Sequence, residues 1–443
     1  MNNKEVTVIG AGLAGCECAW QLAKRGISVN LVEMKPNKKS PAHKSDLFAE
    51  LVCSNSLRSS DVTNAVGLLK EELRRLGSLI IESADKNSVP AGSALAVDRE
   101  GFSKYITDKI RASENIRISS EEAVNIPEGP VIIATGPLTS DAFAEEISRQ
   151  IPGFDLYFFD AVAPIVTLES IDMQNAYFAS RYDKGTPDYV NCPLSKEEYE
   201  SFINELCKAK EAEIHGFDNS AVFEGCMPVE VMAKRGFDTL RFGPMKPVGL
   251  LNPHSGKNDY AVLQLRRDNA DGTLYNLVGF QTHLTFGEQK RIFSMIPALK
   301  NAEFVRYGVM HRNTFLDSPR LLDSKYRLKS NPDISFAGQI TGVEGYVESA
   351  ASGMLVGIET AAKILDKEPA DFPRETAIGA LAAYISNSSI VDFQPMNINF
   401  GIISPLTYKV KGKANKKAEV SNRALKIIDE IQKKEVFSIE NNN

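Results

Sequence analysis

A long apolar run is missing from this chain: none of its 443 residues lies in a stretch of 18 or more consecutive apolar residues. A membrane-spanning helix needs about 20 such residues, so no transmembrane segment is predicted. The first residues lead directly into an apolar strand, VTVIG, without the basic and apolar regions of a secretory signal. We therefore expect a cytoplasmic protein with no membrane partner.

Cysteine is also scarce, with six in the whole chain and no Cys-x-x-Cys pair. This excludes a disulfide framework and argues against a structural zinc site or a thioredoxin-like motif. Cys16 and Cys18 stand two positions apart on a predicted helix and are expected to pack in a core. The sequences typical of His-Glu-x-x-His zinc proteases, P-loop nucleotide hydrolases and nucleophile-elbow serine hydrolases are absent.

What the chain does contain is a dinucleotide-binding motif at residues 5–33. The strand VTVIG runs into AGLAG, a helix is predicted from about Leu13 to Arg25, and the next strand, ISVNLVE, ends on Glu33. Gly10 makes the tight turn, Gly12 lets the backbone approach a pyrophosphate, and Gly15 allows close helix packing. The helix N-terminus faces the phosphates, and the acid can accept hydrogen bonds from ribose hydroxyls.

The motif alone does not separate FAD from NAD, but two later turns favour FAD. A fully apolar strand, VIIATG at 131–136, and the segment FAGQ at 336–339 both end in small residues, and an extended flavin cofactor needs such distant segments. Helices are also predicted over 64–76 and 98–112. The residues predicted to hold the cofactor are Gly10, Ala11, Gly12, Leu13, Ala14, Gly15, Glu33, Gly136, Gly338 and Gln339.

The texture of the sequence changes after Ile151, where prolines and aromatics become frequent, and returns to the nucleotide-binding type near residue 333. We predict an α/β protein with a Rossmann-like FAD-binding domain of the glutathione-reductase type and an inserted α+β domain. The predicted bounds are 1–164 for the first part of the FAD-binding domain, 165–325 for the insertion, and 326–443 for the closing part with its C-terminal helix.

Charge is distributed unevenly. The chain carries a formal net charge of −6, yet residues 231–330 hold 16 Lys and Arg against 8 Asp and Glu. A second basic stretch, YKVKGKANKK at 408–417, precedes the C-terminal helix. A basic module on an acidic scaffold can steer a polyanion to one face, although solvated surface lysines would give the same composition. Within the module Arg235, Arg241 and Lys246 either hold phosphates or solvate a loop.

Two cysteines stand in polar or turn-forming surroundings. Cys53 is followed by Ser54, Asn55 and Ser56, and Cys226 lies between Gly225 and the pair Met227-Pro228. A thiolate at Cys53 could be stabilised by backbone N–H groups or by Arg58, so both cysteines are candidate nucleophiles. The alternative for each is an ordinary packing cysteine.

His283 and Tyr346 are two further candidates with open alternatives. His283, in GFQTHLTFGEQ, is either a satisfied loop histidine or a catalytic or stacking group. Tyr346, in TGVEGYVES, belongs to a core or stacks on a flat ligand.

Four long blocks carry a family resemblance: FAELVCSNSLRS, GCMPVEVMAKRGFDTLRFGPMKPVGL, FQTHLTFGEQKRIFSMIPAL and FAGQITGVEGYVESAASG. Together they resemble the folate- and FAD-dependent tRNA (uracil-5-)-methyltransferase family, often called TrmFO. The likeness extends from the first strand to at least Gly401. The family is similar in flavin fold to the large subunit of the tRNA wobble-uridine modifying complex.

The resemblance implies methylation of carbon 5 of the T-loop uridine of tRNA that becomes ribothymidine. Methylenetetrahydrofolate would give the carbon, reduced FAD the electrons, and NADPH or NADH would restore the reduced flavin. Thiolate addition at carbon 6 activates carbon 5, which is otherwise a poor nucleophile. We assign Cys226 as the nucleophile and Cys53 as the flavin-side base or secondary thiol, with exchanged roles left open. His283 and Tyr346 are candidate stacking partners of the folate, and no stable protein partner is implied.

Three alternatives remain at this point. A related group of enzymes acts on a uridine of large-subunit ribosomal RNA with the same chemistry. A thiol-assisted flavin oxidoreductase would use Cys53 and Cys226 as a redox pair without RNA, which leaves the basic insertion unexplained. A non-enzymatic RNA-binding flavoprotein would need neither thiol.

Overall fold

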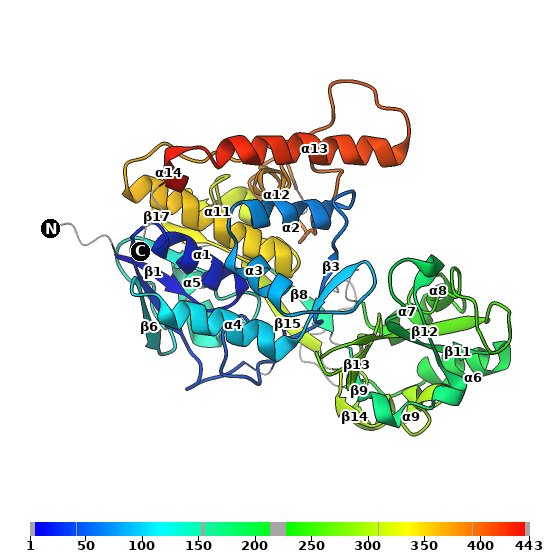
Figure 1. Cartoon of the computed structure of the whole chain (residues 1–443). Coiled ribbons are helices and arrows are strands. Elements are labelled where there is room, and N and C mark those ends of the chain that lie inside the picture. The colour runs from blue at the N-terminus through cyan, green and yellow to red at the C-terminus, as the bar shows by residue number, and fades with distance from the viewer. Residues whose placement is uncertain are drawn as a thin grey trace.

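The computed structural model describes residues 5–40, 42–151, 156–161, 163–212, 227–308, 310–391 and 393–438. For 156–161, 310–314 and residue 413 only the backbone is described. Two lobes are visible in Figure 1. The first lobe is built from residues 5–151 and 316–438, and the second lobe from residues 163–308. A two-stranded antiparallel ribbon, β8 (Leu156–Ala161) and β15 (Met310–Phe315), lies between them.

A six-stranded sheet in the order β16-β17-β7-β1-β2-β6 forms the centre of the first lobe. All neighbours in it are parallel except β16 and β17. The carboxyl ends of β1, β2, β7 and β17 therefore meet at one edge, where ligands bind in open sheets of this kind. The strands are β1 (Glu5–Ile9), β2 (Ser28–Glu33), β6 (Ile116–Ser120), β7 (Val131–Ile133), β16 (Arg327–Leu328) and β17 (Asn331–Phe336).

Helices cover the faces of this sheet, and their sequences explain where several of them begin. The side chains of Asn64, Ser78 and Asp98 accept hydrogen bonds from backbone N–H groups of the first turns of α2, α3 and α4, which satisfies donors that have no partner within the helix. The helices are α1 (Leu13–Ala23), α2 (Ala65–Arg75), α3 (Leu79–Lys86), α4 (Arg99–Ala112), α5 (Asp141–Gln150), α11 (Tyr346–Ile364), α12 (Ala377–Ile385), α13 (Lys413–Ile431) and α14 (Glu435–Ser438).

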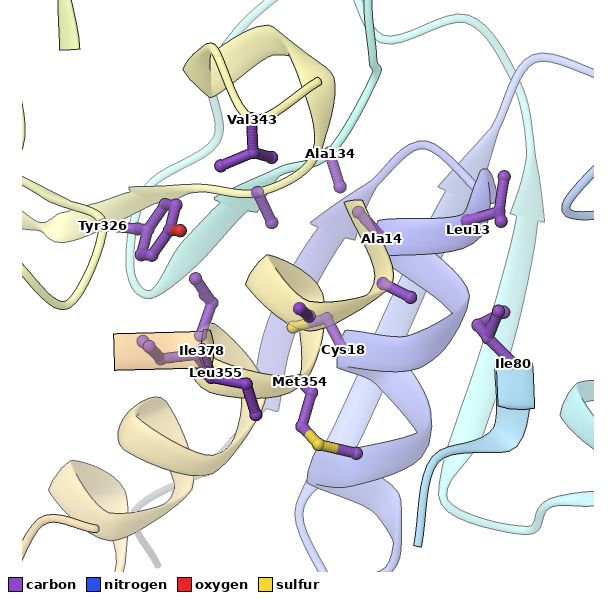
Figure 2. Close-up of a cluster of buried hydrophobic side chains, with 14 of the residues drawn as sticks. Leu13, Ala14, Cys18, Ile80, Ala134, Tyr326, Val343, Met354, Leu355 and Ile378 are labelled. Atoms are coloured by element: carbon purple, nitrogen blue, oxygen red, sulfur yellow. The ribbon is translucent and has the colours of Figure 1, made fainter. Parts of the chain in front are cut away.

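The contact between α1 and α11 is very close, and Figure 2 shows Ala14 and Cys18 of α1 beside Met354 and Leu355 of α11. Glycine makes the contact possible: a Cβ on Gly353 would lie 2.2 Å from the carbonyl oxygen of Ala14, and one on Gly357 would lie 2.9 Å from that of Cys18. Cys16 and Cys18 are both buried, and burial raises the pKa of each thiol. Packing is thus the role of these two cysteines.

The second lobe holds an antiparallel sheet in the order β10-β11-β12-β13-β9-β14, with its own apolar core. Helices α6, α7, α8 and α9 pack around it (Figure 1). The strands are β9 (Ile165–Thr167), β10 (Tyr177–Ala179), β11 (Tyr189–Leu194), β12 (Ala261–Arg267), β13 (Leu274–Leu277) and β14 (Phe304–Arg306). Its helices are α6 (Lys196–Leu206), α7 (Val229–Lys234), α8 (Thr239–Phe242) and α9 (Phe286–Phe293). The short helix α10 (Ser318–Leu321) belongs to the first lobe.

A small sheet in the order β3-β5-β4 extends the first lobe toward the second. Its strands are β3 (Ser56–Ser59), β4 (Ser88–Val89) and β5 (Ala94–Val97). The predicted fold class is confirmed, and the helices predicted over 13–25, 64–76 and 98–112 are present as α1, α2 and α4. The predicted domain bounds stay a prediction. Among the described residues no helix has the length and apolar character that crossing a membrane requires.

Candidate functional site

A cleft of about 1040 Å³ opens at the carboxyl edge of the parallel sheet. Its walls come from the ends of β1, β2, β6, β7 and β17 and from the start of α11, which are far apart in the sequence. Eight of the ten residues predicted to hold a cofactor line it: Gly10, Gly12, Leu13, Ala14, Glu33, Gly136, Gly338 and Gln339. Ala11 and Gly15 stand just behind this wall, where they support the glycine turn.

The three glycines of the turn have three different surroundings. Gly10 has φ +99°, and a Cβ there would lie 2.7 Å from the carbonyl oxygen of Ala134. A Cβ on Gly15 would lie only 1.8 Å from the carbonyl oxygen of Gly10. A Cβ on Gly12 would meet no protein atom within 4 Å. Gly12 is therefore bare toward the cleft, as a close backbone approach to a pyrophosphate requires.

Glu33 ends β2 and is 7% exposed. Its carboxylate accepts hydrogen bonds from the backbone N–H groups of Ala11 (2.7 Å) and Lys35 (3.0 Å). The acid is thereby fixed between the glycine turn and the end of β2, where it can also accept from hydroxyl groups of a ligand in the cleft.

The far side of the cleft is formed by the turns after β7 and β17. Gly136 has φ +70° with open space at its missing Cβ, and Gly338 has φ +87°. The N–H of Gly338 donates to the hydroxyl of Ser352 (2.7 Å), and the amide of Gln339 donates to Glu344 (2.6 Å). Glycine is the residue that adopts such positive φ values without strain. Together these surroundings fit an extended dinucleotide such as FAD.

Cys53 lies at the rim of this cleft. Its neighbour Val52 and Tyr346, the first residue of α11, both line the cleft, and the N–H of Cys53 donates to the Tyr346 hydroxyl at 2.8 Å. Cys53 is half-buried, and burial raises the pKa of Tyr346, so the phenol stays neutral. The structure thus brings one predicted thiol and one predicted stacking residue to the predicted cofactor cleft.

Arginines clamp the Cys53 segment. Arg99 donates to the carbonyl of Cys53 (2.9 Å) and to that of Leu51, and Arg306 donates to the carbonyl of Val52. Arg266 binds the hydroxyl of Ser54 at 2.6 Å. Four consecutive residues, 51–54, are therefore each held by a guanidinium. We call Arg99, Arg266 and Arg306 the arginine cluster.

One carboxylate faces the arginine cluster: Asp268 pairs with Arg99 through two bonds of 2.9 and 3.0 Å. Burial favours a lower pKa for all three arginines, and the pKa values of Arg266 and Arg306 are lowered. At Arg99 the charge and hydrogen bonds of Asp268 outweigh burial, and the pKa is raised. A negatively charged Cys53 acts on each of the three in the opposite direction. Three guanidinium groups thus surround the Cys53 segment, one of them paired with Asp268.

Arg58 has a different role from the one that its position in the sequence indicates. Its guanidinium pairs with Glu348 of α11, whose side chain is fully buried. The backbone of Arg58 has φ +63°, in the left-handed region. The cations that surround the Cys53 segment are distant in sequence, at positions 99, 266 and 306, and no local pattern indicates them.

His283 does not line the cleft. It is 2% exposed, and its ring lies between Glu230 (2.7 Å from Nδ1) and Glu211 (3.0 Å from Nε2). Burial alone would lower the pKa of His283, but the two carboxylates outweigh burial and raise it. This surrounding favours the satisfied histidine among the alternatives that the sequence left open.

Cys226 lies outside the described residues, but the chain on both sides of 213–226 is in view. The N–H of Ala212 donates to the carbonyl of His283 (2.8 Å), and the N–H of Val229 donates to that of Gln281 (2.7 Å). The residues on both sides of 213–226, the segment that contains Cys226, are therefore bound to residues 281–283. The ring of His283 lies between Glu211, which precedes this segment, and Glu230, which follows it.

The predicted RNA-binding residues lie in and after α7 and α8, on the second lobe. Arg241 donates to the carbonyl of Tyr260 (3.0 Å) and to Asp238 (2.8 Å), and its guanidinium stacks 3.6 Å from the centroid of the Tyr260 ring. Arg235 is exposed at the end of α7, and Lys246 is partly exposed. Among the described residues no group of His, Cys, Asp and Glu could hold a metal ion.

Comparisons with known proteins give a matching family model, relatives of similar sequence and a solved structure of similar fold. The family model described as glucose inhibited division protein A matches residues 5–368. A protein of Acetivibrio thermocellus named methylenetetrahydrofolate--tRNA-(uracil-5-)-methyltransferase TrmFO is 61% identical over 96% of this chain and 98% of its own length. Proteins of the same name from Listeria innocua and Lactobacillus acidophilus are 59% and 58% identical. A solved structure of Aquifex aeolicus GidA superposes with a TM-score of 0.71 at 16% identity, over 98% of this chain and 75% of that one.

Proposed function

The chain belongs to the glucose inhibited division protein A family, and from that premise we propose that it is a folate-dependent tRNA (uracil-5-)-methyltransferase that uses methylenetetrahydrofolate. The names of its relatives at 58–61% identity support this activity. The observation in the molecule that carries it is the position of Cys53, a thiol whose peptide N–H is bound by Tyr346 at the rim of the dinucleotide cleft.

The cofactor proposed for the cleft is FAD. Gly10, Gly12 and the N-terminus of α1 would hold its pyrophosphate, Glu33 its ribose, and Gly338 with Gln339 the end nearest α11. FAD in its reduced form supplies the two electrons that turn a transferred methylene carbon into a methyl group. NADPH or NADH is the proposed source of those electrons, and the T-loop uridine of tRNA is the proposed target.

The reaction at the uracil ring needs two protein groups. A thiolate adds to carbon 6, which places a pair of electrons on carbon 5 and lets that carbon take the one-carbon unit. The proton on carbon 5 then passes to a base as the bond between the one-carbon unit and its amine carrier breaks, which leaves an exocyclic methylene and the free amine. That methylene accepts hydride, and the thiol leaves as the ring double bond re-forms. We propose Cys226 as the thiolate and Cys53 as the base or secondary thiol. The positive charge of the arginine cluster beside the Cys53 segment would favour a thiolate at Cys53 over the thiol.

Tyr346 stays the proposed stacking partner of the folate, because it is at the cleft and its ring is presented by α11. A stacking role for His283 has less support, because both of its ring nitrogens face carboxylates in the second lobe. These contacts favour another role for His283, which is to hold together the two ends of the segment that contains Cys226. The target base has to leave its stack to reach the cleft, as in other base-modifying enzymes.

A labelling experiment tests the activity. The protein is incubated with NADPH, carbon-labelled methylenetetrahydrofolate and unmodified tRNA transcript, and the RNA is digested to nucleosides. We expect label in 5-methyluridine at the T-loop position. Absence of label from uridine, or label that requires S-adenosylmethionine, would defeat the proposal. A ribosomal RNA fragment in a parallel reaction separates the tRNA target from the alternative one.

Changes in the arginine cluster should alter the reactivity of Cys53 in two directions. Replacing Arg306 by methionine removes a positive charge and should slow alkylation of Cys53 by iodoacetamide at pH 7 by roughly tenfold. Replacing Asp268 by asparagine removes the negative charge and should speed it. Peptide mass spectrometry of the Cys53 peptide measures both rates, and Arg320→Met, at an exposed position paired with Asp317, is the control. Slower alkylation in the Asp268→Asn variant, or an unchanged rate in the Arg306→Met variant, would contradict the electrostatic role.

A further inference from the structure

The basic stretch at the start of α13 is not used by the cleft, and it is well exposed. Lys409, Lys411 and Lys416 are exposed, and Lys417 lies with its ammonium 5.5 Å from the centroid of the Phe400 ring. None of these four lysines forms an ion pair within the described part of the chain, whereas pairs such as Arg74–Glu71 and Lys86–Glu82 join other surface charges. Unpaired cations on an acidic protein are an anion-binding surface.

This segment is fixed to the first lobe. Arg423 of α13 donates to the carbonyls of Pro405 (2.8 Å) and Ser404, the Tyr408 hydroxyl donates to Glu419 (3.2 Å), and Ser421 donates to the carbonyl of Val62 (2.7 Å). The lysines are therefore presented by an ordered element. A rigid platform loses less conformational entropy on binding than a flexible tail does.

A second set of exposed cations and aromatics lies where the second lobe faces the first, close to the bond from the N–H of Gly92 to Asp188 (3.1 Å). Arg181 donates to the carbonyls of Lys246 (2.8 Å) and Val248 (2.6 Å), which joins the segments 181–184 and 246–251. Tyr182 is 56% exposed, and Lys184 beside it has no ion pair among the described residues. Tyr182 and Asp183 both have positive φ values, 59° and 52°. Such strained non-glycine positions persist mainly where function needs them.

Asp61 connects the two sets. Its bonds to Thr63 lower its pKa most, and Lys184 of the second lobe and Lys417 of α13 lower it further. The contacts place both lysines beside this residue. The carbonyl oxygen of Lys184 lies 3.8 Å from the position of a Cβ on Gly92, and the N–H of Ser60 donates to the carbonyl of Ser93 at 2.9 Å. The bond from Ser421 to Val62 brings α13, which carries Lys417, to the other side of Asp61. The chain from Cys53 to Asp61 can span at most roughly 30 Å. A single folded RNA can therefore contact the lysines near Asp61 and also place a nucleotide in the cleft.

We propose that Lys409, Lys411, Lys416, Lys417 and Lys184 form one surface that binds the phosphate backbone of the RNA substrate away from the target nucleotide and holds it against both lobes. This inference rests on the proposed function, because it takes RNA as the occupant. Charge complementarity supports RNA, since none of these lysines forms an ion pair among the described residues, and the exposed ring of Tyr182 can stack on an unpaired base.

The test compares two triple variants of equal charge. In the first, Lys409, Lys411 and Lys416 become glutamine. In the control, Lys208, Lys290 and Lys300 do, which are exposed in the second lobe and outside the proposed surface. Binding of the full-length protein to unmodified tRNA transcript is measured by fluorescence anisotropy over a salt series. The first variant should lose at least about tenfold in affinity at low salt, and its slope of log K against log salt should fall by about 2 to 3.

The control should bind as the parent does, and Lys184→Gln alone should lower the slope by about 1. Thermal melting checks that each variant is folded. If the parent binds RNA and the first variant keeps the same affinity and slope, the surface inference is wrong while the proposed function stands. If the parent neither binds nor methylates RNA, both are wrong. Lysine-dependent binding to phosphatidylserine vesicles with unchanged RNA binding would also overturn the inference.

Discussion

Alanine at Cys226 is expected to abolish methylation, by at least about a thousandfold, because carbon 5 of uracil is not nucleophilic until a thiolate adds to carbon 6. The same variant should fail to form a covalent adduct with tRNA that contains 5-fluorouracil. Fluorine at carbon 5 cannot leave as a proton, so the parent enzyme stays bonded to this RNA and the complex survives denaturing electrophoresis.

Alanine at Cys53 should separate the two roles. Methylation should fall by at least about a hundredfold, since the ring keeps its carbon 5 proton without a base, but the adduct with fluorouracil-containing tRNA should remain. Cys207→Ala is the matched control, because Cys207 is half-buried at the end of α6 and outside the cleft. If the adduct instead depends on Cys53 and not on Cys226, the two roles are exchanged. An adduct that survives in each single variant and in the double variant C53A/C226A would exclude both cysteines as the nucleophile.

The second large effect is expected at Gly12. A Cβ at this position meets no protein atom within 4 Å and the backbone φ is −75°, so Gly12→Ala should fold with unchanged stability. The methyl group would nevertheless stand where a pyrophosphate has to approach the backbone. We expect the purified variant to lose the flavin absorbance near 450 nm, or to bind added FAD at least about tenfold more weakly, with the melting temperature of the apoprotein unchanged.

Gly15 gives the contrasting result. A Cβ there would overlap the carbonyl oxygen of Gly10 at 1.8 Å, so Gly15→Ala should lose both the flavin and several degrees of melting temperature. Equal flavin affinity in Gly12→Ala and the parent would show that the phosphates do not pass this glycine. The pair of variants therefore distinguishes a binding defect from a packing defect at positions three residues apart.

The cofactor site was predictable because its signals are local. The glycine turn, α1 and Glu33 occupy one βαβ unit, and the turns after β7 and β17 each follow an apolar strand. The sheet then brings these segments together, because parallel neighbours place their carboxyl ends at one edge.

The surroundings of the two predicted thiols were not predictable. Arg99, Arg266 and Arg306 reach the Cys53 segment across 46 to 254 positions of sequence, and Arg58, the cation that proximity indicated, is turned toward Glu348. The carboxylates that hold His283 likewise come from 53 and 72 positions away. Such contacts depend on how the two lobes and their loops pack, and a single sequence carries no periodic signal for them.

The order in which the strands enter the parallel sheet has a consequence for synthesis on the ribosome. β17 pairs with β7, and α11 packs on α1, yet about 200 residues separate β7 from β17. While the intervening lobe emerges, the amino-terminal half exposes an unpaired strand edge at β7 and an uncovered face of α1. At about 5–20 residues per second this lasts on the order of ten seconds or more. Nascent chains that end before residue 364 are accordingly the species that a chaperone would need to shield.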